Sequence, residues 1–464
     1  MPILKFPQTA APEQLNLQSL LGTTTANGDP VLPLTHSLHF RVHTRVLLTL
    51  LVALAAAAVL WAEPSYRGLM REAGEAQKAG NLPLLIEKLE AVRAQRPDYP
   101  RVLLALVRAH TAAGKSDPQA LDRAIAVLSS VAARGLAFDP AKDPSLAPLS
   151  THPEFPRLAA ELARNAAPRG QVATAQTLPA QSGVVESAVV DSQGRWYFGD
   201  VRLRCIWKRG ADGALVRFTK ADAPLLGVFG LAVDNARGVL WAGVSAVEIT
   251  KDLDAATEKG RGYLAEFDLE TGALLRRLDL PASPSGHVLG SLRLDADGTL
   301  YATDSTSPVI WRVAPGATRA EAWIESPEFM SLQGLAFSAD RRTLFVSDYA
   351  NGLWAIDVAA KQASLLKPAD DSMLFGIDDL QRHGDSLVGV QNGVTPLRIV
   401  RLRVTADTVR TEVLAQGREE ISDAATGSIV GGAYLFIGNS GWAIHEGAKT
   451  EPPPRDVRLI SLQL

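Results

Sequence analysis

The carboxy-terminal part of the chain repeats one short pattern six times, and this repeat limits the possible fold more than any other feature. Each copy has a small residue, an apolar stretch, a turn and a second apolar or aromatic stretch. The copies begin at Ser187, Gly230, Ser291, Gly334, Gly376 and Gly427, with successive gaps of 43, 61, 43, 42 and 51 residues. A period of about 40–50 residues with about four strands per unit is typical of β-propellers. We therefore predict that residues 173–464 form a mainly β, six-bladed propeller, in which residues 457–462 pair within the first or last blade and close the ring.

Residues 65–168 have a different pattern, rich in alanine and leucine with a helical period. The turn residues Gly80 and Gly114 are 34 residues apart, which is the tetratricopeptide period. We expect an α-helical, tetratricopeptide-like domain, capped by residues 135–162. Such a domain could offer a groove to a protein partner, or it could be a spacer between a membrane and the propeller. Of the two, we favour the spacer.

The segment that precedes the helical region is apolar. Residues 46–62 (VLLTLLVALAAAAVLWA) carry no charge, and seventeen residues is about the shortest length that spans a bilayer as a helix. We interpret residues 45–63 as an N-terminal hydrophobic helix, either a transmembrane anchor or a cleaved signal, with a buried soluble helix as the weaker alternative. Residues 1–44 are polar and aperiodic, which predicts a disordered tail. The bulk of the chain is then expected outside the cytoplasm, in the periplasm, or secreted if the segment is cleaved.

Charge and cysteine content exclude several classes of function. The chain has 47 Lys and Arg residues against 50 Asp and Glu residues, a net charge of -3, so it offers no overall basic surface for a nucleic acid partner. The one cysteine, Cys205, cannot form an intramolecular disulfide or a four-thiolate zinc or iron–sulfur site. No phosphate-binding glycine loop and no nucleophile elbow are present.

Two of the repeats resemble a known family. Residues 186–191 (ESAVVD) with 196–200 (WYFGD), and residues 332–338 (LQGLAFS) with 344–348 (LFVSD), are similar to motifs of the gluconolactonase and regucalcin (senescence marker protein) family. The resemblance covers residues 175–464. It implies a six-bladed propeller that hydrolyses sugar lactones or related esters with a divalent cation, calcium or zinc.

The family's cation ligands are Glu in the first blade, Asn in the third and fourth, and Asp in the fifth. The residues that we match to these positions are Glu186, Gly290, Gln333 and Phe375. Only Glu186 is retained, and calcium requires six to eight oxygen ligands. We therefore expect calcium or zinc to bind weakly or not at all, although Glu186 remains the candidate metal ligand.

The candidate site residues lie near the openings of the inner strands, which converge on the propeller axis. We expect Glu186, Gln333 and Asp378 to form one cluster at the mouth of the channel, with the Phe375 ring beside them. Glu186 and Asp378 are the candidate catalytic carboxyl groups, because burial beside an aromatic ring raises a carboxyl pKa. Gln333, Phe375 and His287 are candidate substrate-binding residues. The structural alternatives are a solvated charge for Glu186, an interblade hydrogen bond for Gln333, a backbone cap for Asp378 and a loop position for His287.

Two functions follow from these assignments. In the first, a membrane-anchored or exported propeller, tethered through residues 46–62, binds a small molecule or a partner at its mouth. In the second, it is a metal-assisted lactonase or a related ester hydrolase. Because three of the four assigned ligand positions are changed, the sequence favours the first.

Overall fold

The computed structural model describes residues 65–181, 183–210, 213–220, 225–448 and 450–464. The expected tail, residues 1–44, and the expected hydrophobic helix, residues 45–63, lie outside these ranges. Within the described ranges, no helix is long and apolar enough to cross a membrane.

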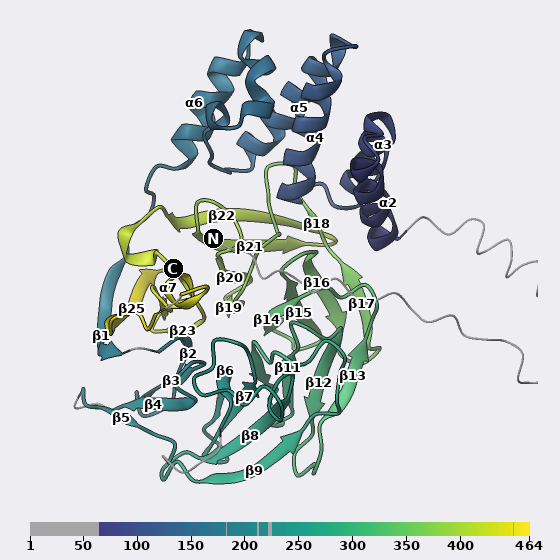
Figure 1. The fold of residues 1–464 in the computed structure, drawn as a ribbon. Helices are drawn as coiled ribbons and strands as arrows, with labels where there is room; N and C mark the ends of the chain where they lie inside the picture. The colour runs from purple at the N-terminus through teal and green to yellow at the C-terminus, as the bar shows by residue number, and fades with distance from the viewer. Residues whose placement is uncertain (1–64, 182, 211–212, 221–224, 449) are drawn as a thin grey trace, which may run out of the picture. The chain divides into compact units, whose positions relative to one another are not determined.

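Six separate sheets form six blades (Figure 1). The first blade contains β2 (Val185–Val190), β3 (Trp196–Asp200), β4 (Cys205–Arg209) and β5 (Leu215–Arg217). The second contains β6 (Gly227–Asp234), β7 (Val239–Ser245), β8 (Gly262–Asp268) and β9 (Leu274–Asp279). The third contains β10 (Leu292–Leu294), β11 (Leu300–Thr303), β12 (Val309–Val313) and β13 (Glu321–Glu325). These four-stranded antiparallel sheets confirm the predicted propeller repeat.

The other three blades continue the ring. The fourth contains β14 (Leu332–Phe337), β15 (Thr343–Asp348), β16 (Gly352–Asp357) and β17 (Gln362–Leu365). The fifth contains β19 (Gln381–His383), β20 (Ser386–Gln391), β21 (Arg398–Thr405) and β22 (Thr408–Gln416), and β18 (Lys367–Pro368) joins its edge in parallel. The sixth contains β23 (Gly427–Val430), β24 (Ala433–Ile437), β25 (Arg455–Gln463) and β1 (Ala173–Gln181).

The ring closes through the sixth blade, which combines the two ends of the propeller sequence. The C-terminal strand β25 lies between β24 and β1 and pairs antiparallel with both. Leu178 of β1 is fully buried and belongs to a core cluster with Val457 and Leu459 of β25. Closure by the last strand was predicted, whereas the contribution of β1 as the outermost strand was not.

A buried Asp–Trp pair recurs in three blades. Asp200, Asp304 and Asp348 lie at the end of a second strand or directly after it, and each carboxylate accepts a hydrogen bond from an indole on the third strand. The indole donors are Trp207, Trp311 and Trp354, at 3.1, 3.2 and 3.3 Å. The same carboxylates also accept backbone N–H groups of adjacent loops. These aspartates therefore tie the loops to the blades.

The helical region contains α2 (Tyr66–Lys78), α3 (Leu82–Gln95), α4 (Pro100–Ala113), α5 (Gln119–Ala133) and α6 (Phe155–Asn165), with 3-10 turns η1 (Pro140–Lys142) and η2 (Pro144–Thr151) before α6. The Asn81 side chain accepts the Leu84 N–H at the start of α3, and Pro100 occupies the first turn of α4, where its missing N–H costs nothing. Apolar faces of α4 and α5 pack together. The tetratricopeptide-like character of this region stays a prediction.

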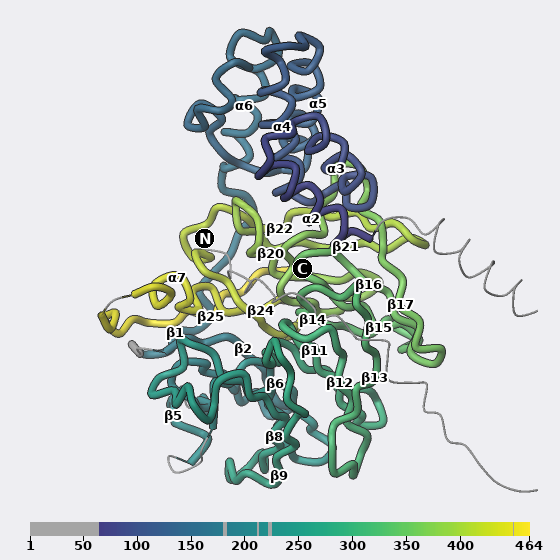
Figure 2. Tube along the Cα trace, turned by 45° about the vertical axis from the view of Figure 1, so that its right-hand side comes forward, coloured from purple at the N-terminus to yellow at the C-terminus, as the bar shows by residue number. Residues whose placement is uncertain are grey.

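The helical region is hydrogen-bonded to the propeller. Arg398 of β21 donates to the Arg134 carbonyl at 3.1 Å, and Gln416 of β22 donates to the Asn165 carbonyl at 2.8 Å. In Figures 1 and 2, α4 to α6 accordingly lie on the side of the β21–β22 hairpin. These contacts are compatible with a segment that lies between a membrane and the propeller, so the spacer hypothesis stays a prediction.

Candidate carboxyl site at one end of the channel

The pairing register shows which residues occupy equivalent places in the blades. The last residue of the second strand pairs with a residue on the innermost side in three blades. The pairs are Asp200 of β3 with Val185, Asp348 of β15 with Leu332, and Gln391 of β20 with Ile377. The residue that follows each of these partners is Glu186, Gln333 or Asp378.

The register therefore corrects one sequence assignment. Asp378, and not Phe375, occupies the fifth-blade position that corresponds to Glu186. The sequence pattern placed the start of the fifth blade's innermost strand at Gly376. Gly376 instead forms a bend with a φ of 76°, and the strand β19 begins only at Gln381.

Glu186 lies on β2, where a short C-terminal helix contacts it. Its Oε2 accepts a hydrogen bond from Nε1 of Trp442 at 2.5 Å. Trp442 begins α7 (Trp442–His445), and its ring also packs against Phe229. Asp423 accepts the N–H groups of Gly441 and Ala443, so this carboxylate fixes the start of α7 and thereby the Trp442 indole.

Asp378 is held by a chain of side-chain hydrogen bonds. Its Oδ2 accepts from Nδ2 of Asn392 at 2.7 Å, and Asn392 Oδ1 accepts from the Tyr349 hydroxyl at 3.0 Å. Asn392 also donates to the Ala424 carbonyl. The side chains of the fourth and fifth blades and the backbone before the sixth blade are thus joined at Asp378.

The pKa values of both carboxyl groups are raised above their usual values. Burial is the main reason that the pKa of Glu186 is well above its usual value, and the negative charge of Asp378 raises it further, against the hydrogen bond from Trp442. Burial also raises the pKa of Asp378 to about 6, with added repulsion from Asp379 and Asp423 and opposition from the Asn392 hydrogen bond. Because the charge of Asp378 adds to the burial of Glu186, a proton held by the pair is favoured on Glu186 over Asp378.

Gln333 lies next to Asp378 through the backbone. The N–H of Gly334 donates to the Asp378 carbonyl at 3.0 Å. The Gln333 amide, however, contacts two hydroxyl groups, with Oε1 3.2 Å from Ser305 Oγ and Nε2 3.3 Å from Ser331 Oγ. Its side chain is therefore engaged by the third and fourth blades.

Phe375 lies within a row of aromatic rings. Its ring centroid is 4.9 Å from that of Tyr99, in the helical region, and 6.0 Å from that of Tyr349. Because Tyr349 is hydrogen-bonded to Asn392, the row ends beside Asp378. Burial and the charges of Asp378 and Glu186 raise the Tyr349 pKa, so its hydroxyl is neutral and acts as a donor.

His287 is enclosed by protein acceptors. Its Nδ1 lies 2.6 Å from Asp304 Oδ2, its Nε2 lies 2.7 Å from the Pro281 carbonyl oxygen, and the residue is only 4% exposed. Burial lowers the pKa of His287, but the hydrogen bond and charge of Asp304 together with the hydrogen bond to the Pro281 carbonyl give a net increase. This environment is that of a histidine that braces a loop, as in the structural alternative considered above.

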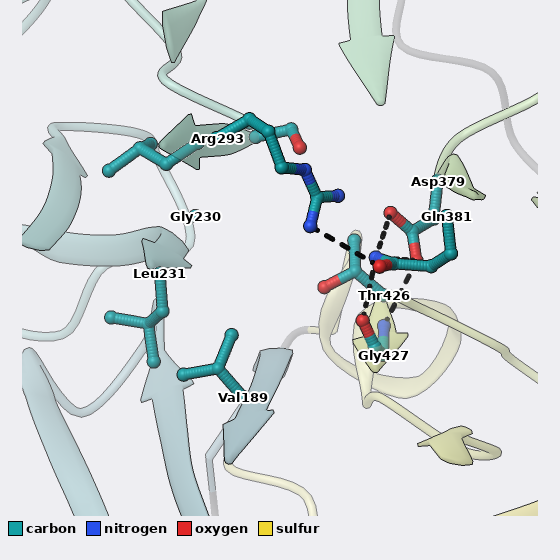
Figure 3. A pocket seen from close by; sticks show the side chains of 11 residues that line it. Val189, Gly230, Leu231, Arg293, Asp379, Gln381, Thr426 and Gly427 are labelled. Carbon is teal, nitrogen blue, oxygen red and sulfur yellow. Dashed lines mark hydrogen bonds between the residues drawn. The ribbon is translucent and has the colours of Figure 1, made fainter. Parts of the chain in front are cut away.

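A small pocket between the blades is lined by Arg293, Asp379 and Gln381, among other residues (Figure 3). Arg293 donates to the carbonyls of Leu335 and Leu380 and to Gln381 Oε1, and Gln381 Nε2 donates to Asp379. The remaining cavity is about 20 Å³, which is room for about one water molecule. A larger apolar hollow of about 380 Å³ lies elsewhere, beside α6 and Thr395.

The donor set does not fit the cation of the resembled family. Glu186 and Asp378 supply two carboxylates, but Gly290 has no side chain, and a Cβ there would lie 2.9 Å from Gln333 Oε1. The Gln333 amide thus takes the space of a third-blade ligand and is bound to hydroxyl groups. No cluster of three or more His, Cys, Asp or Glu side chains suited to a metal was found among the described residues. We derive no chemical step through a metal.

No protein-family model and no curated protein match the chain. Among solved structures, it is similar to a PQQ-bound aldose sugar dehydrogenase from Streptomyces coelicolor, with 13% identity and a TM-score of 0.44 over 64% of this chain and 100% of that one. It is also similar to a catalytically inactive virginiamycin B lyase from Staphylococcus aureus, with 15% identity and a TM-score of 0.41 over 63% and 99%. A protein described as a gluconolactonase gives 16% identity and a TM-score of 0.41 over 63% and 91%. The similarity at these identities is one of fold.

Three residues of the site were not found by sequence reasoning. Trp442, Tyr349 and Asn392 all contact the carboxyl groups directly or through one hydrogen bond. Asn392 precedes Gly393, and an Asn-Gly dipeptide is typical of turns, so the sequence gives no reason to expect its contact with Asp378. Trp442 follows a loop after the last repeat, so the repeat pattern gave no signal for it.

Proposed function

We propose that the chain binds a small, neutral, oxygen-rich ring molecule, such as a sugar or a sugar lactone, at the Glu186–Asp378 pair. The observation that carries the proposal is the pair itself: two carboxyl groups from different blades that burial and mutual repulsion keep from ionising together. Perturbed carboxyl groups of this kind cluster at functional sites.

The protonation states favour a neutral, oxygen-rich ligand. A protonated Glu186 donates a hydrogen bond to a carbonyl or ether oxygen, while an ionised Asp378 accepts one from a hydroxyl group. The half-buried Tyr349 ring, which is joined to Asp378 through Asn392, offers apolar surface to a ring molecule. An anionic ligand would be repelled by Asp378 and Asp423.

A second candidate function is hydrolysis without a metal. Both carboxyl pKa values are raised, and the charge of Asp378 raises that of Glu186 further, so such a pair can divide the roles of acid and base. Asp378 would take a proton from a water molecule that attacks the ester carbonyl, and Glu186 would give its proton to the departing oxygen. Hydrolysis of a lactone would give a hydroxy acid, with Asp378 left protonated and Glu186 left ionised.

The location of the protein is part of the proposal. We propose that residues 46–62 export or anchor the chain, so that the propeller meets its ligand outside the cytoplasm, and that the outer surface of the helical region is available to a protein partner. Both parts rest on the sequence patterns described above.

Thermal-shift measurements on the full chain test the binding proposal. The panel comprises neutral sugars, sugar lactones, sugar acids and organic amines. We expect a neutral sugar or lactone to raise the melting temperature, and this rise to be lost in Glu186→Gln and Asp378→Asn but kept in the exposed fifth-blade variant Asp385→Asn. If no panel compound acts, or if the rise persists in both site variants, the proposal is wrong.

Two further measurements distinguish binding alone from hydrolysis without a metal and from metal-assisted hydrolysis. Release of hydroxy acid from a lactone that acts in the thermal-shift assay, lost in Glu186→Gln, would establish the hydrolase. Calorimetry with calcium and with zinc is the second arm. Tight binding of one equivalent that Glu186→Gln abolishes would contradict the donor-set argument and support the metal-assisted lactonase instead.

A further inference from the structure

The turn between α3 and α4 contacts the propeller at the loops that carry the candidate site. Arg96 Nε donates to Asn351 Oδ1 at 3.2 Å, in the loop after β15. Asp98 Oδ2 accepts the N–H of Leu374 at 2.6 Å. The Tyr99 ring packs against that of Phe375, the residue after Leu374, at an interplanar angle of 34°. One short turn of the helical region thus reaches both the fourth and the fifth blade.

A series of ring contacts and hydrogen bonds connects the α3–α4 turn to Asp378. Tyr99 and Phe375 are 8% and 9% exposed, so the two rings exclude water from each other's faces. Phe375 packs on Tyr349, and Tyr349 is joined through Asn392 to Asp378. Arg101, an exposed residue of α4, lies close enough for its charge to act on Tyr349.

The loop before β19 needs this outside support. It runs from Ala369 to Leu380 with little regular pairing, and Gly376 bends it with a positive φ against Gly393. The buried Asp98 carboxylate, 5% exposed, satisfies the Leu374 N–H, which a loop of this kind would otherwise expose or leave unpaired. The helical region therefore holds the loop at both Leu374 and Phe375.

We propose that the α3–α4 turn supports the ligand site from outside, with Asp98 and Tyr99 as positioning residues for the loop that carries Phe375 and Asp378. This inference rests on the proposed function of the Glu186–Asp378 pair. It gives the helical region a role in selecting the ligand. Removing the Tyr99 ring opens the aromatic row to water, whereas removing only its hydroxyl group keeps the row intact.

Carboxyl titration by carbon-13 NMR of the full chain tests this inference without a ligand. We expect Tyr99→Ala to lower the pKa of Asp378 by about half a unit or more, because water then reaches the site. Tyr99→Phe should leave the pKa unchanged, and so should Val127→Ala, which truncates a buried residue of α5. Equal shifts in Tyr99→Ala and Val127→Ala would show a general effect of helical stability and would overturn the proposal.

A second variant keeps the test decisive if Tyr99→Ala does not fold. Arg101 is exposed, so Arg101→Glu should fold, and it should raise the pKa of the carboxyl pair by a few tenths of a unit. The proposal fails if neither variant moves the titration of Glu186 or Asp378. Failure of the proposed function would give a different result. In that case both carboxyl groups of the unmodified chain would titrate in the ordinary range.

Discussion

The double variant Glu186→Gln/Asp378→Asn is expected to be more stable than the unmodified protein at pH 8 and almost equally stable at pH 4. The pKa of each carboxyl group is raised in the folded state, to about 6 for Asp378 and well above the usual value for Glu186. The folded protein therefore binds these protons more tightly than the unfolded chain does. Stability is fully present below pH 4 and is lost as the pH rises through the raised pKa values.

The size of the effect follows from the shift. One unit of pKa corresponds to about 1.4 kcal/mol, and because Asp378 is partly exposed we expect about 2 kcal/mol from this residue at pH 8, with a further contribution from Glu186. The amide variants remove the charge and keep an oxygen for Trp442 and Asn392. Stabilisation with loss of function is common at binding sites.

Melting temperatures between pH 4 and pH 8 measure this difference. Asp385→Asn and Glu325→Gln, two exposed carboxyl groups, are matched controls and should show little change with pH relative to the unmodified chain. A difference between the double variant and the unmodified chain that stays constant from pH 4 to pH 8 would show that the carboxyl groups ionise as in the unfolded chain.

Loss of strand β1 should abolish cooperative folding of the propeller. A chain that begins at residue 170 keeps β1, whereas one that begins at residue 183 leaves β25 as an unpaired edge and uncovers the apolar surface around Leu178. Burial of one leucine alone contributes about 1.5–3 kcal/mol, and an open ring also exposes an aggregation-prone strand edge. We expect the longer chain to be destabilised by loss of the helical contacts but folded, and the shorter one to aggregate.

Gel filtration and circular dichroism on the two shortened chains provide the measurement. A synthetic peptide of residues 170–181 should restore the melting transition of the shorter chain by adding the missing strand, and a scrambled peptide should not. Identical melting of the two shortened chains would mean that β1 does not close the ring.

Much of the fold followed from the repeat because strand periodicity and turns are local features. The innermost strands β2, β14 and β23 begin within a few residues of their predicted markers. The fifth blade is the exception, because Gly376 there is a bend and not a strand residue. The pairing of β1 with β25 joins segments more than 270 residues apart, which no local pattern could indicate.

The site was predictable only in part. Glu186 and Asp378 follow residues at equivalent register positions in the first and fifth blades, while the cluster of Glu186, Gln333 and Asp378 stays a prediction. The neighbours that hold them come from distant segments: Trp442 of the C-terminal helix α7 binds Glu186, and Asn392, itself bound by Tyr349, binds Asp378. Their roles arise from the packing of three parts of the chain, so the sequence of any one part contains no sign of them.

The most direct test of the account is the titration of the Glu186 carboxyl carbon by NMR in the unmodified protein and in Asp378→Asn. We expect the Glu186 pKa to lie well above the ordinary glutamate value in the unmodified protein and to fall by on the order of one unit when the Asp378 charge is removed. An ordinary Glu186 pKa that does not change in Asp378→Asn would show that the two carboxyl groups do not form one site.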